Sequence, residues 1–100
     1  IIGVIGEPNA LEGIIILRLG STWYSDQTVL EELSAFVLPE FRRSDNAKNL
    51  IDFAKECAKQ IGVPLIIGVV SNHRTEAKVA LYRRRLGAPA GAFFLANAGA

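Results

Sequence analysis

The feature that most constrains the fold is a change of hydrophobic period in the middle of the chain. Apolar side chains recur at helical spacing over residues 46–61, whereas residues 65–70 (LIIGVV) form a short, uninterrupted apolar run. The first pattern predicts an amphipathic helix that ends at Gly62 and Pro64, and the second predicts a strand covered on both faces. The inward positions of the helix are Ala47, Leu50, Ile51, Ala54, Cys57, Ala58 and Ile61. Because a further strand is expected just before this helix, the segment predicts a strand–helix–strand unit with a parallel crossover.

The rest of the chain adds a hairpin before this unit and a helix and a strand after it. Residues 1–6 and 11–19 are β-rich runs separated by a loop with turn chemistry, and residues 29–38 form the third strand. Residues 75–86 predict a second helix that Gly87 closes, and residues 92–96 predict a last strand. The predicted order is β-β-β-α-β-α-β. It corresponds to one domain of the α/β (α+β) class, with a mixed, mostly antiparallel sheet and a central parallel strand pair.

Composition excludes several functional classes. Half of the 100 residues are apolar and 21% are charged, so the chain is expected to fold. The 11 Lys+Arg against 10 Asp+Glu exclude a nucleic-acid partner bound by bulk charge, and the apolar runs are too short to span a membrane. Cys57 and His73 are the only Cys and His, so neither a disulfide nor a metal site is expected. We expect a cytoplasmic protein with no metal and no membrane partner.

The passage from the third strand into the first helix is the candidate binding segment. Such a junction directs the free N–H groups and the positive dipole end of the helix toward one point, which suits a phosphate or pyrophosphate group. Arg42 and Arg43 lie just before the helix and add positive charge. The residues alone leave an alternative open, in which Ser44, Asp45 or Asn46 only caps the helix and both arginines are solvated.

Two motifs in this order of elements resemble those of the GNAT superfamily, the Gcn5-related N-acetyltransferases. Residues 42–47 (RRSDNA) are similar to the acetyl-CoA loop of the family, Gln/Arg-x-x-Gly-x-Gly/Ala, with Asp45 where the family prefers Gly. Residues 80–88 (ALYRRRLGA) are similar to the family's LY-x-x-x-GF helix end, with Ala88 in place of Phe. The predicted element order also matches the family from its second strand onward.

The resemblance covers residues 1–100 and implies a single GNAT-like acyl-CoA N-acyltransferase domain. Domains of this family normally begin with a strand and two helices ahead of the hairpin. Together with the lack of methionine, the resemblance leads us to expect a domain that is incomplete at its N-terminus.

The resemblance implies the transfer of an acetyl group from acetyl-CoA to a primary amine by direct attack in a ternary complex. The acceptor would be a small-molecule or a protein amine. The implied cofactor-binding residues are Phe36, Val37, Arg42, Arg43, Ser44, Asp45, Asn46, Ala47, Lys48, Asn72, Thr75 and Lys78. The basic cluster at residues 83–85 could contact the adenosine 3′-phosphate or an acidic partner, but we expect it to be a solvated helix face.

Catalytic residues follow from the same resemblance. Tyr82 matches the position of the family's general acid, and a phenol pKa lies not far above that of a thiol. Glu31 and Glu32 are the candidates for the base. Counting back from Arg42 favours Glu31, although a β-bulge would exchange the faces of the two glutamates.

Simple alternation along the third strand separates its side chains into two sets. Leu33, Ala35 and Val37 are predicted on one face, and Glu32, Ser34 and Phe36 on the other.

Two other classes of function stay open from the sequence. One is a non-catalytic CoA-binding or regulatory module in which Asp45 has weakened catalysis. The other is an oligomeric interaction protein, such as a homodimer, whose apolar sheet edge pairs with another subunit.

Overall fold

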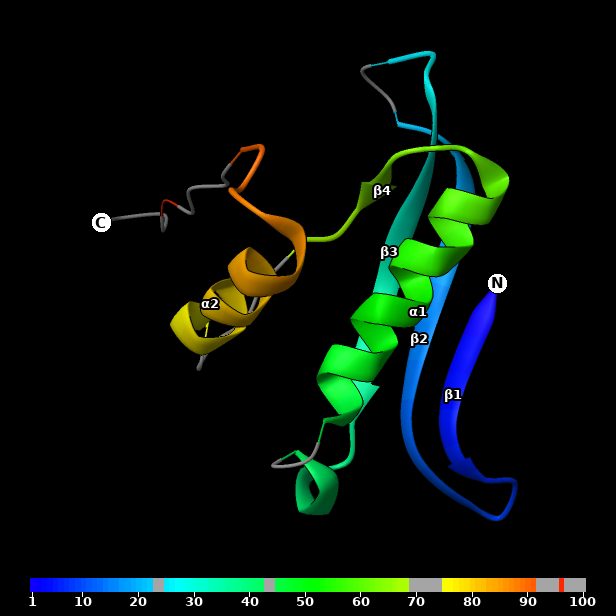
Figure 1. The fold of residues 1–100 in the computed structure, drawn as a ribbon, viewed down its shortest axis with the longest axis vertical. Coiled ribbons are helices and arrows are strands. Elements are labelled where there is room, and N and C mark those ends of the chain that lie inside the picture. The colour runs from blue at the N-terminus through cyan, green and yellow to red at the C-terminus, as the bar shows by residue number, and fades with distance from the viewer. Residues whose placement is uncertain (23–24, 43–44, 69–74, 92–95, 97–100) are drawn as a thin grey trace.

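The computed structural model describes residues 1–22, 25–42, 45–68, 75–91 and 96. Its elements are β1 (Ile2–Glu7), β2 (Ala10–Ser21), β3 (Thr28–Val37), a short 3-10 helix η1 (Pro39–Phe41), α1 (Asn46–Ile61), β4 (Leu65–Ile66) and α2 (Thr75–Leu86), as Figure 1 shows. The strands lie in the order β1-β2-β3-β4, with antiparallel β1–β2 and β2–β3 pairs and a parallel β3–β4 pair. This arrangement confirms the mixed, mostly antiparallel α+β fold. The strand predicted at 92–96 lies outside the described residues except for Ala96, which is not in a strand.

The strand–helix–strand unit forms as its hydrophobic period predicts. Helix α1 spans the predicted residues and ends at Gly62, whose φ of 84° is favourable for a residue without a Cβ atom. The backbone N–H of Leu30 donates to the carbonyl of Pro64 at 2.9 Å, which starts the parallel pairing. The strand predicted at 65–70 is shorter than expected, since pairing ends at Ile66, and Leu65 and Ile66 are only half-buried. Residues 69 and 70 lie outside the described part of the chain.

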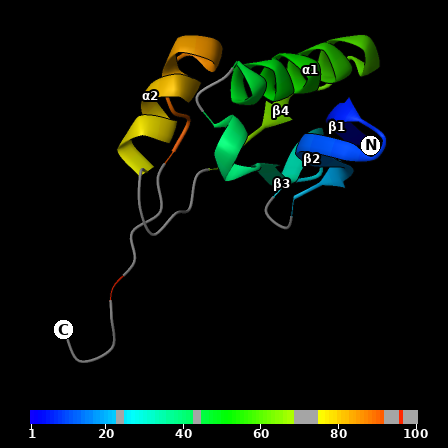
Figure 2. The same ribbon diagram turned by 90° about the horizontal axis from the view of Figure 1, so that it is seen from below.

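The hydrophobic core lies between α1 and one face of the sheet. Figure 2 shows α1 lying across that face. The buried side chains of this core are Ile15, Leu17, Leu30, Val37, Leu50, Ala54 and Ala58. All predicted inward positions of α1 are buried or half-buried except Ile61, which is 42% exposed in the last turn of the helix. The amphipathic pattern therefore identified the face of α1 that packs on the sheet.

A β-bulge at Leu33 decides which side chains of β3 face α1. Ser34 pairs with Ile16 and Glu32 pairs with Leu17, so Leu33 is an extra residue in β3. Directly paired residues project from the same face of a sheet, and Leu17 is buried beneath α1, so Glu32 lies on the α1 side. The predicted strand faces were therefore wrong for Glu32, because one inserted residue shifts a two-residue period.

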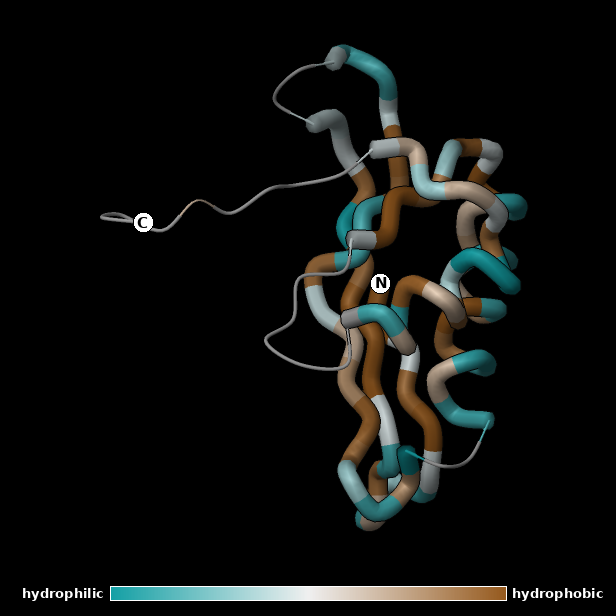
Figure 3. The backbone as a smooth tube through the Cα atoms, turned by 90° about the vertical axis from the view of Figure 1, so that its left-hand side faces the viewer, coloured by the Kyte–Doolittle hydropathy of each residue, from teal (hydrophilic) through white to brown (hydrophobic). Residues whose placement is uncertain are grey.

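The opposite face of the sheet is apolar. Ile2 and Val4 are 64% and 52% exposed, and Ile14 pairs across the sheet with Phe36, which is 46% exposed. Figure 3 shows hydrophobic residues running through the strands, while hydrophilic residues occupy the outer side of α1. No helix among the described residues covers this second face (Figure 2).

Candidate active site

The site begins where β3 and β4 separate. The parallel pairing consists of Leu30 with Leu65 and Glu31 with Ile66, after which residues 67–68 leave the strand. Strand β3 continues to Val37, so over residues 32–37 its outer edge has no strand partner within the described part of the chain. Backbone N–H and C=O groups on such an edge can pair with an extended ligand.

The side chain of Arg42 holds the end of β3. Its Nε donates a hydrogen bond of 2.8 Å to the carbonyl of Val37, and its guanidinium carbon lies 5.2 Å from the centre of the Phe36 ring. The second distance is within the range of a cation–π contact. Three of the predicted cofactor-binding residues are thus brought together at one end of the strand.

The first turn of α1 lies just beyond this point. Asp45 precedes the helix and is exposed, and its side chain makes no capping hydrogen bond to the helix. Asn46 is 7% exposed, and its Nδ2 donates to Oε1 of Glu12 at 3.1 Å. Ala47 packs against the core and Lys48 is half-buried. Because the Asp45 carboxylate makes no hydrogen bond to the first N–H groups of α1, it does not satisfy the donors that an anion would bind there. Arg43 and Ser44 lie outside the described residues.

Glu32 and Tyr82 lie 50 positions apart in the sequence, and the charge of Glu32 nevertheless acts on the Tyr82 phenol. Tyr82 is half-buried on α2; burial, and then the negative charge of Glu32, raise the pKa of its phenol. The pKa of Glu32 is raised in turn by burial and by the neighbouring charge of Glu31. Both groups therefore favour their protonated forms more than exposed groups would.

Glu31 lies on the other face of the sheet. Its Oε1 is 3.9 Å from Nε of Arg18, the residue with which it pairs across β2 and β3. The bulge at Leu33 separates the two candidate bases in this way, and it directs Glu32 rather than Glu31 toward the side where Tyr82 lies.

The remaining predicted residues belong to α2 or precede it. Thr75 is the first residue of this helix, and Lys78 lies one turn later with an exposed side chain. Asn72 falls outside the described residues, so the structure leaves its predicted role untested.

One functional feature was not predicted from the sequence. Nη2 of Arg85 on α2 lies 2.7 Å and 2.8 Å from the two carboxylate oxygens of Asp52 on α1, and Nζ of Lys55 donates to the carbonyl of Arg85 at 2.9 Å. The hydrogen bond from Arg85 and the positive charges nearby lower the pKa of Asp52. Arg85 was expected to be solvated with its two neighbours, because a partner 33 residues away leaves no local signal in the sequence.

Two features are absent from the described residues. They contain no cluster of three or more His, Cys, Asp or Glu side chains placed to hold a metal ion. Within the same part of the chain, neither helix is long and apolar enough to cross a membrane.

Comparison with known proteins gives matches by structure only. No family model and no curated protein sequence matches the chain. Among solved structures, AAC(6')-Iy in complex with the bisubstrate analogue CoA-S-monomethyl-acetylneamine matches with a TM-score of 0.72 and 16% identity, over 96% of this chain and 67% of that one. Ribosomal-protein-alanine N-acetyltransferase from Brucella melitensis biovar Abortus 2308 matches with a TM-score of 0.70 and 17% identity, over 94% and 67% of the two chains.

A third match is an aminoglycoside acetyltransferase from an uncultured soil metagenomic sample. It has a TM-score of 0.69 and 17% identity, over 91% of this chain and 60% of that one. The chain thus spans about 60 to 67% of the length of these structures. At this level of identity the comparison concerns the backbone alone, and it agrees with the motifs at residues 42–47 and 80–88. The chain therefore has the fold of the GNAT acetyltransferases.

Proposed function

We propose that the protein is an N-acetyltransferase that transfers the acetyl group of acetyl-CoA to a primary amine in a ternary complex. The observation that carries this proposal is the electrostatic influence on the Tyr82 phenol of Glu32, the residue that follows the last β3–β4 pair. A partly buried carboxylate and a partly buried phenol that it influences would supply a base for the incoming amine and an acid for the departing thiol. The acetyltransferase fold of the structural matches supports the same reaction class.

The residues present fit acetyl-CoA. The unpaired edge of β3 at Phe36 and Val37 would pair with the amides of the pantetheine arm. The N–H groups at the start of α1, together with Arg42, would bind the pyrophosphate. One of the matched structures contains a CoA-based bisubstrate analogue, which supports this class of ligand. Asp45 is compatible with it because its exposed carboxylate makes no bond to the helix N–H groups.

The chemistry can be written for the residues of this chain. The Glu32 carboxylate accepts a proton from the acceptor ammonium, directly or through water, and the freed amine attacks the thioester carbonyl carbon. As the C–N bond forms, the C–S bond breaks and the sulfur leaves as a thiolate, to which the Tyr82 hydroxyl donates its proton. The new amide nitrogen then gives its remaining extra proton to the Tyr82 phenolate, which restores the hydroxyl. A raised pKa keeps Tyr82 protonated until that step, and it brings the pKa of Glu32 closer to neutral pH than that of an exposed carboxylate.

The acceptor would be a small-molecule or protein amine. The matched structures include an aminoglycoside acetyltransferase and a ribosomal-protein-alanine N-acetyltransferase, which supports both kinds of amine. A cytoplasmic location and a homodimer complete the proposal; the exposed apolar face around Ile2, Val4 and Phe36 supports a second subunit.

The test separates an enzyme from a CoA-binding module. Tyr82→Phe should keep its affinity for acetyl-CoA in isothermal titration and lose turnover by about 100-fold, a typical contribution of a general acid. Tyr24→Phe is the matched control, because it alters the only other tyrosine of the chain. A folded protein that fails to bind acetyl-CoA would overturn the proposal, and full turnover by Tyr82→Phe would remove the assigned acid.

A further inference from the structure

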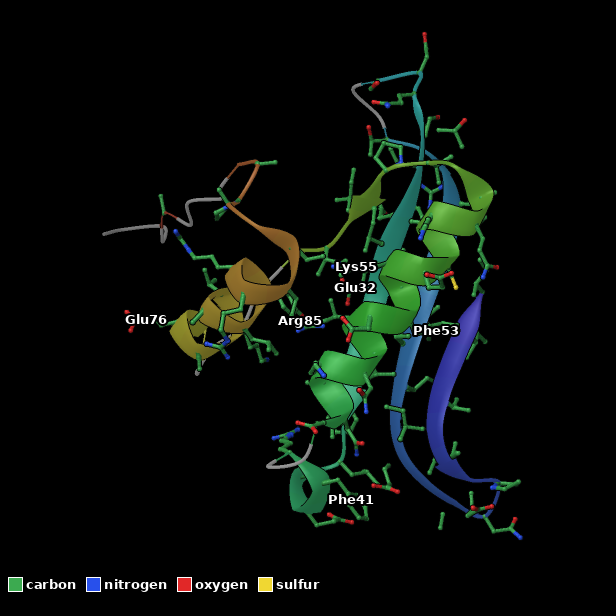
Figure 4. All side chains as sticks on the ribbon, viewed as in Figure 1. Glu32, Phe41, Phe53, Lys55, Glu76 and Arg85 are labelled. Atoms are coloured by element: carbon green, nitrogen blue, oxygen red, sulfur yellow. The ribbon has the colours of Figure 1, made fainter. Side chains whose placement is uncertain are left out.

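Helix α2 is held to the rest of the protein by a polar contact rather than by a broad apolar face. Helix α1 has four buried apolar residues, whereas on α2 Val79 and Leu81 are half-buried and Ala77 and Leu86 are exposed. The contact of α2 with α1 is centred on Arg85. Figure 4 shows the Arg85 side chain between the two helices, in the region where Lys55 and Glu32 also lie.

The geometry of this contact is specific. Nη2 of Arg85 donates to Oδ1 and Oδ2 of Asp52 at 2.8 Å and 2.7 Å, and Nε donates to Oδ1 at 3.2 Å. A guanidinium that engages a carboxylate through several N–H groups fixes an orientation as well as a distance. Lys55 Nζ, on the same helix as Asp52, bonds the backbone carbonyl of Arg85 at 2.9 Å. Side chain and backbone of Arg85 are therefore both joined to α1.

Arg85 lies three residues after Tyr82, and residues at this spacing project from neighbouring positions on one side of a helix. Glu32 is held independently, because the pairing of β3 with β2 and β4 sets its position. Helix α1 packs on that same sheet through the core. The relative placement of Tyr82 and Glu32 consequently depends on how α2 attaches to α1, and the Arg85–Asp52 contact is the most directional part of that attachment.

We infer that Asp52 and Arg85 are positioning residues, whose ion pair holds α2, and with it Tyr82, against α1 on the side of the sheet where Glu32 lies. The inference rests on the proposed function for its catalytic consequence only. The placement of Tyr82 can be measured in the resting protein without any substrate, so the two proposals can fail separately.

The resting-state test uses the ionisation of the Tyr82 phenol. In a Tyr24→Phe background Tyr82 is the only tyrosine, so absorbance of tyrosinate reports its pKa directly. Glu32→Gln should lower this pKa, which verifies that the phenol senses Glu32. Asp52→Asn, which removes the charge and one acceptor oxygen, should lower it toward the ordinary value of about 10 as Tyr82 moves into solvent and away from Glu32.

Matched controls are present on both helices. Glu56→Gln removes an exposed carboxylate of α1 one turn from Asp52, and Arg84→Gln removes an exposed cation beside Arg85. Neither change should alter the pKa of Tyr82. Arg85→Asp combined with Asp52→Arg restores a pair of opposite charges between the two helices. This double variant should recover part of the raised Tyr82 pKa that Asp52→Asn loses. Thermal unfolding of each variant identifies any loss of the whole fold.

Activity supplies the second readout. Asp52→Asn should lower kcat by about tenfold while the affinity for acetyl-CoA changes less, because the phosphate and pantetheine contacts proposed above lie on β3 and α1. An unchanged Tyr82 titration in folded Asp52→Asn would overturn the inference. A shifted titration in a protein that shows no acetyl transfer would leave the inference standing and contradict the proposed function.

Discussion

The carbonyl of Val37 accepts a hydrogen bond of 2.8 Å from Nε of Arg42, and the same guanidinium lies over the Phe36 ring. One side chain from the segment that leads into α1 thereby fixes the last two residues of β3. The contact joins the two parts of the proposed cofactor site, the strand edge and the helix start. It also shows that Arg42 has an internal role in addition to the phosphate contact proposed for it.

Arg42→Lys should weaken the binding of acetyl-CoA by about tenfold. Lysine keeps the positive charge but lacks the planar fork that reaches the Val37 carbonyl and stacks on Phe36, and a hydrogen bond from a charged donor contributes about 1.5–3 kcal/mol. Isothermal titration measures the change, with Arg84→Lys on the exposed face of α2 as the control. Equal affinities for the two variants would contradict this role of Arg42.

The raised pKa of Glu32 predicts how stability depends on pH. Because the folded-state pKa lies above its ordinary value of 4.5, the folded protein retains this proton longer than the unfolded chain. Ionisation of Glu32 therefore costs stability as the pH rises through the window from 4.5 to the raised value, and the cost persists at higher pH. Below 4.5 both states are protonated and the cost is absent.

Glu32→Gln should accordingly be more stable than the parent at pH 7, and the difference should shrink as the pH falls toward 4. Denaturant unfolding at several pH values measures it. Glu31→Gln provides the comparison, since its carboxylate lies near Arg18 and not on the α1 side. A stability difference between Glu32→Gln and the parent that grows toward low pH would contradict a raised pKa of Glu32 in the folded protein.

Leu50→Ala should lower the free energy of unfolding by about 2–5 kcal/mol, because Leu50 is buried between α1 and the sheet and its truncation leaves a cavity. Leu33→Ala changes the same residue type at the bulge, where the side chain is 55% exposed, and should cost well under half as much. Chemical denaturation of both variants tests the comparison. Similar losses of stability in the two variants would contradict the placement of Leu50 in the core and of Leu33 at the surface.

Gly6→Ala should be destabilising by about 1–3 kcal/mol. Gly6 has a φ of 112°, and a Cβ atom there would lie 2.6 Å from the carbonyl oxygen of Ala10 across the hairpin. Gly68→Ala is the control, because a Cβ atom at that position meets nothing within 4 Å. Thermal unfolding should separate the two variants clearly, and equal midpoints would argue against the hairpin geometry.

Local patterns in the sequence determined most of the secondary structure. The spacing of apolar residues over 46–61, with Gly62 and Pro64 after it, predicted α1 to the residue, and the β-rich runs predicted the hairpin within two residues. These elements depend on propensity, period and turn chemistry, which act between residues close in the chain. The motifs at 42–47 and 80–88 are also short segments of sequence, and their resemblance to those of the acetyltransferases pointed to the fold.

Tertiary structure alone decided which groups meet. The bulge at Leu33 depends on how β3 aligns with β2, and it places Glu32 on the α1 side while Glu31 faces Arg18. The Asp52–Arg85 contact depends on how α2 packs against α1. The register of β3 against β2 and the packing of α2 on α1 are set by contacts between residues far apart in the sequence. The local spacing of apolar residues therefore does not predict them. The sequence named Tyr82 and two possible bases, and only the register of β3 against β2 decided that Glu32, rather than Glu31, lies on the α1 side of the sheet.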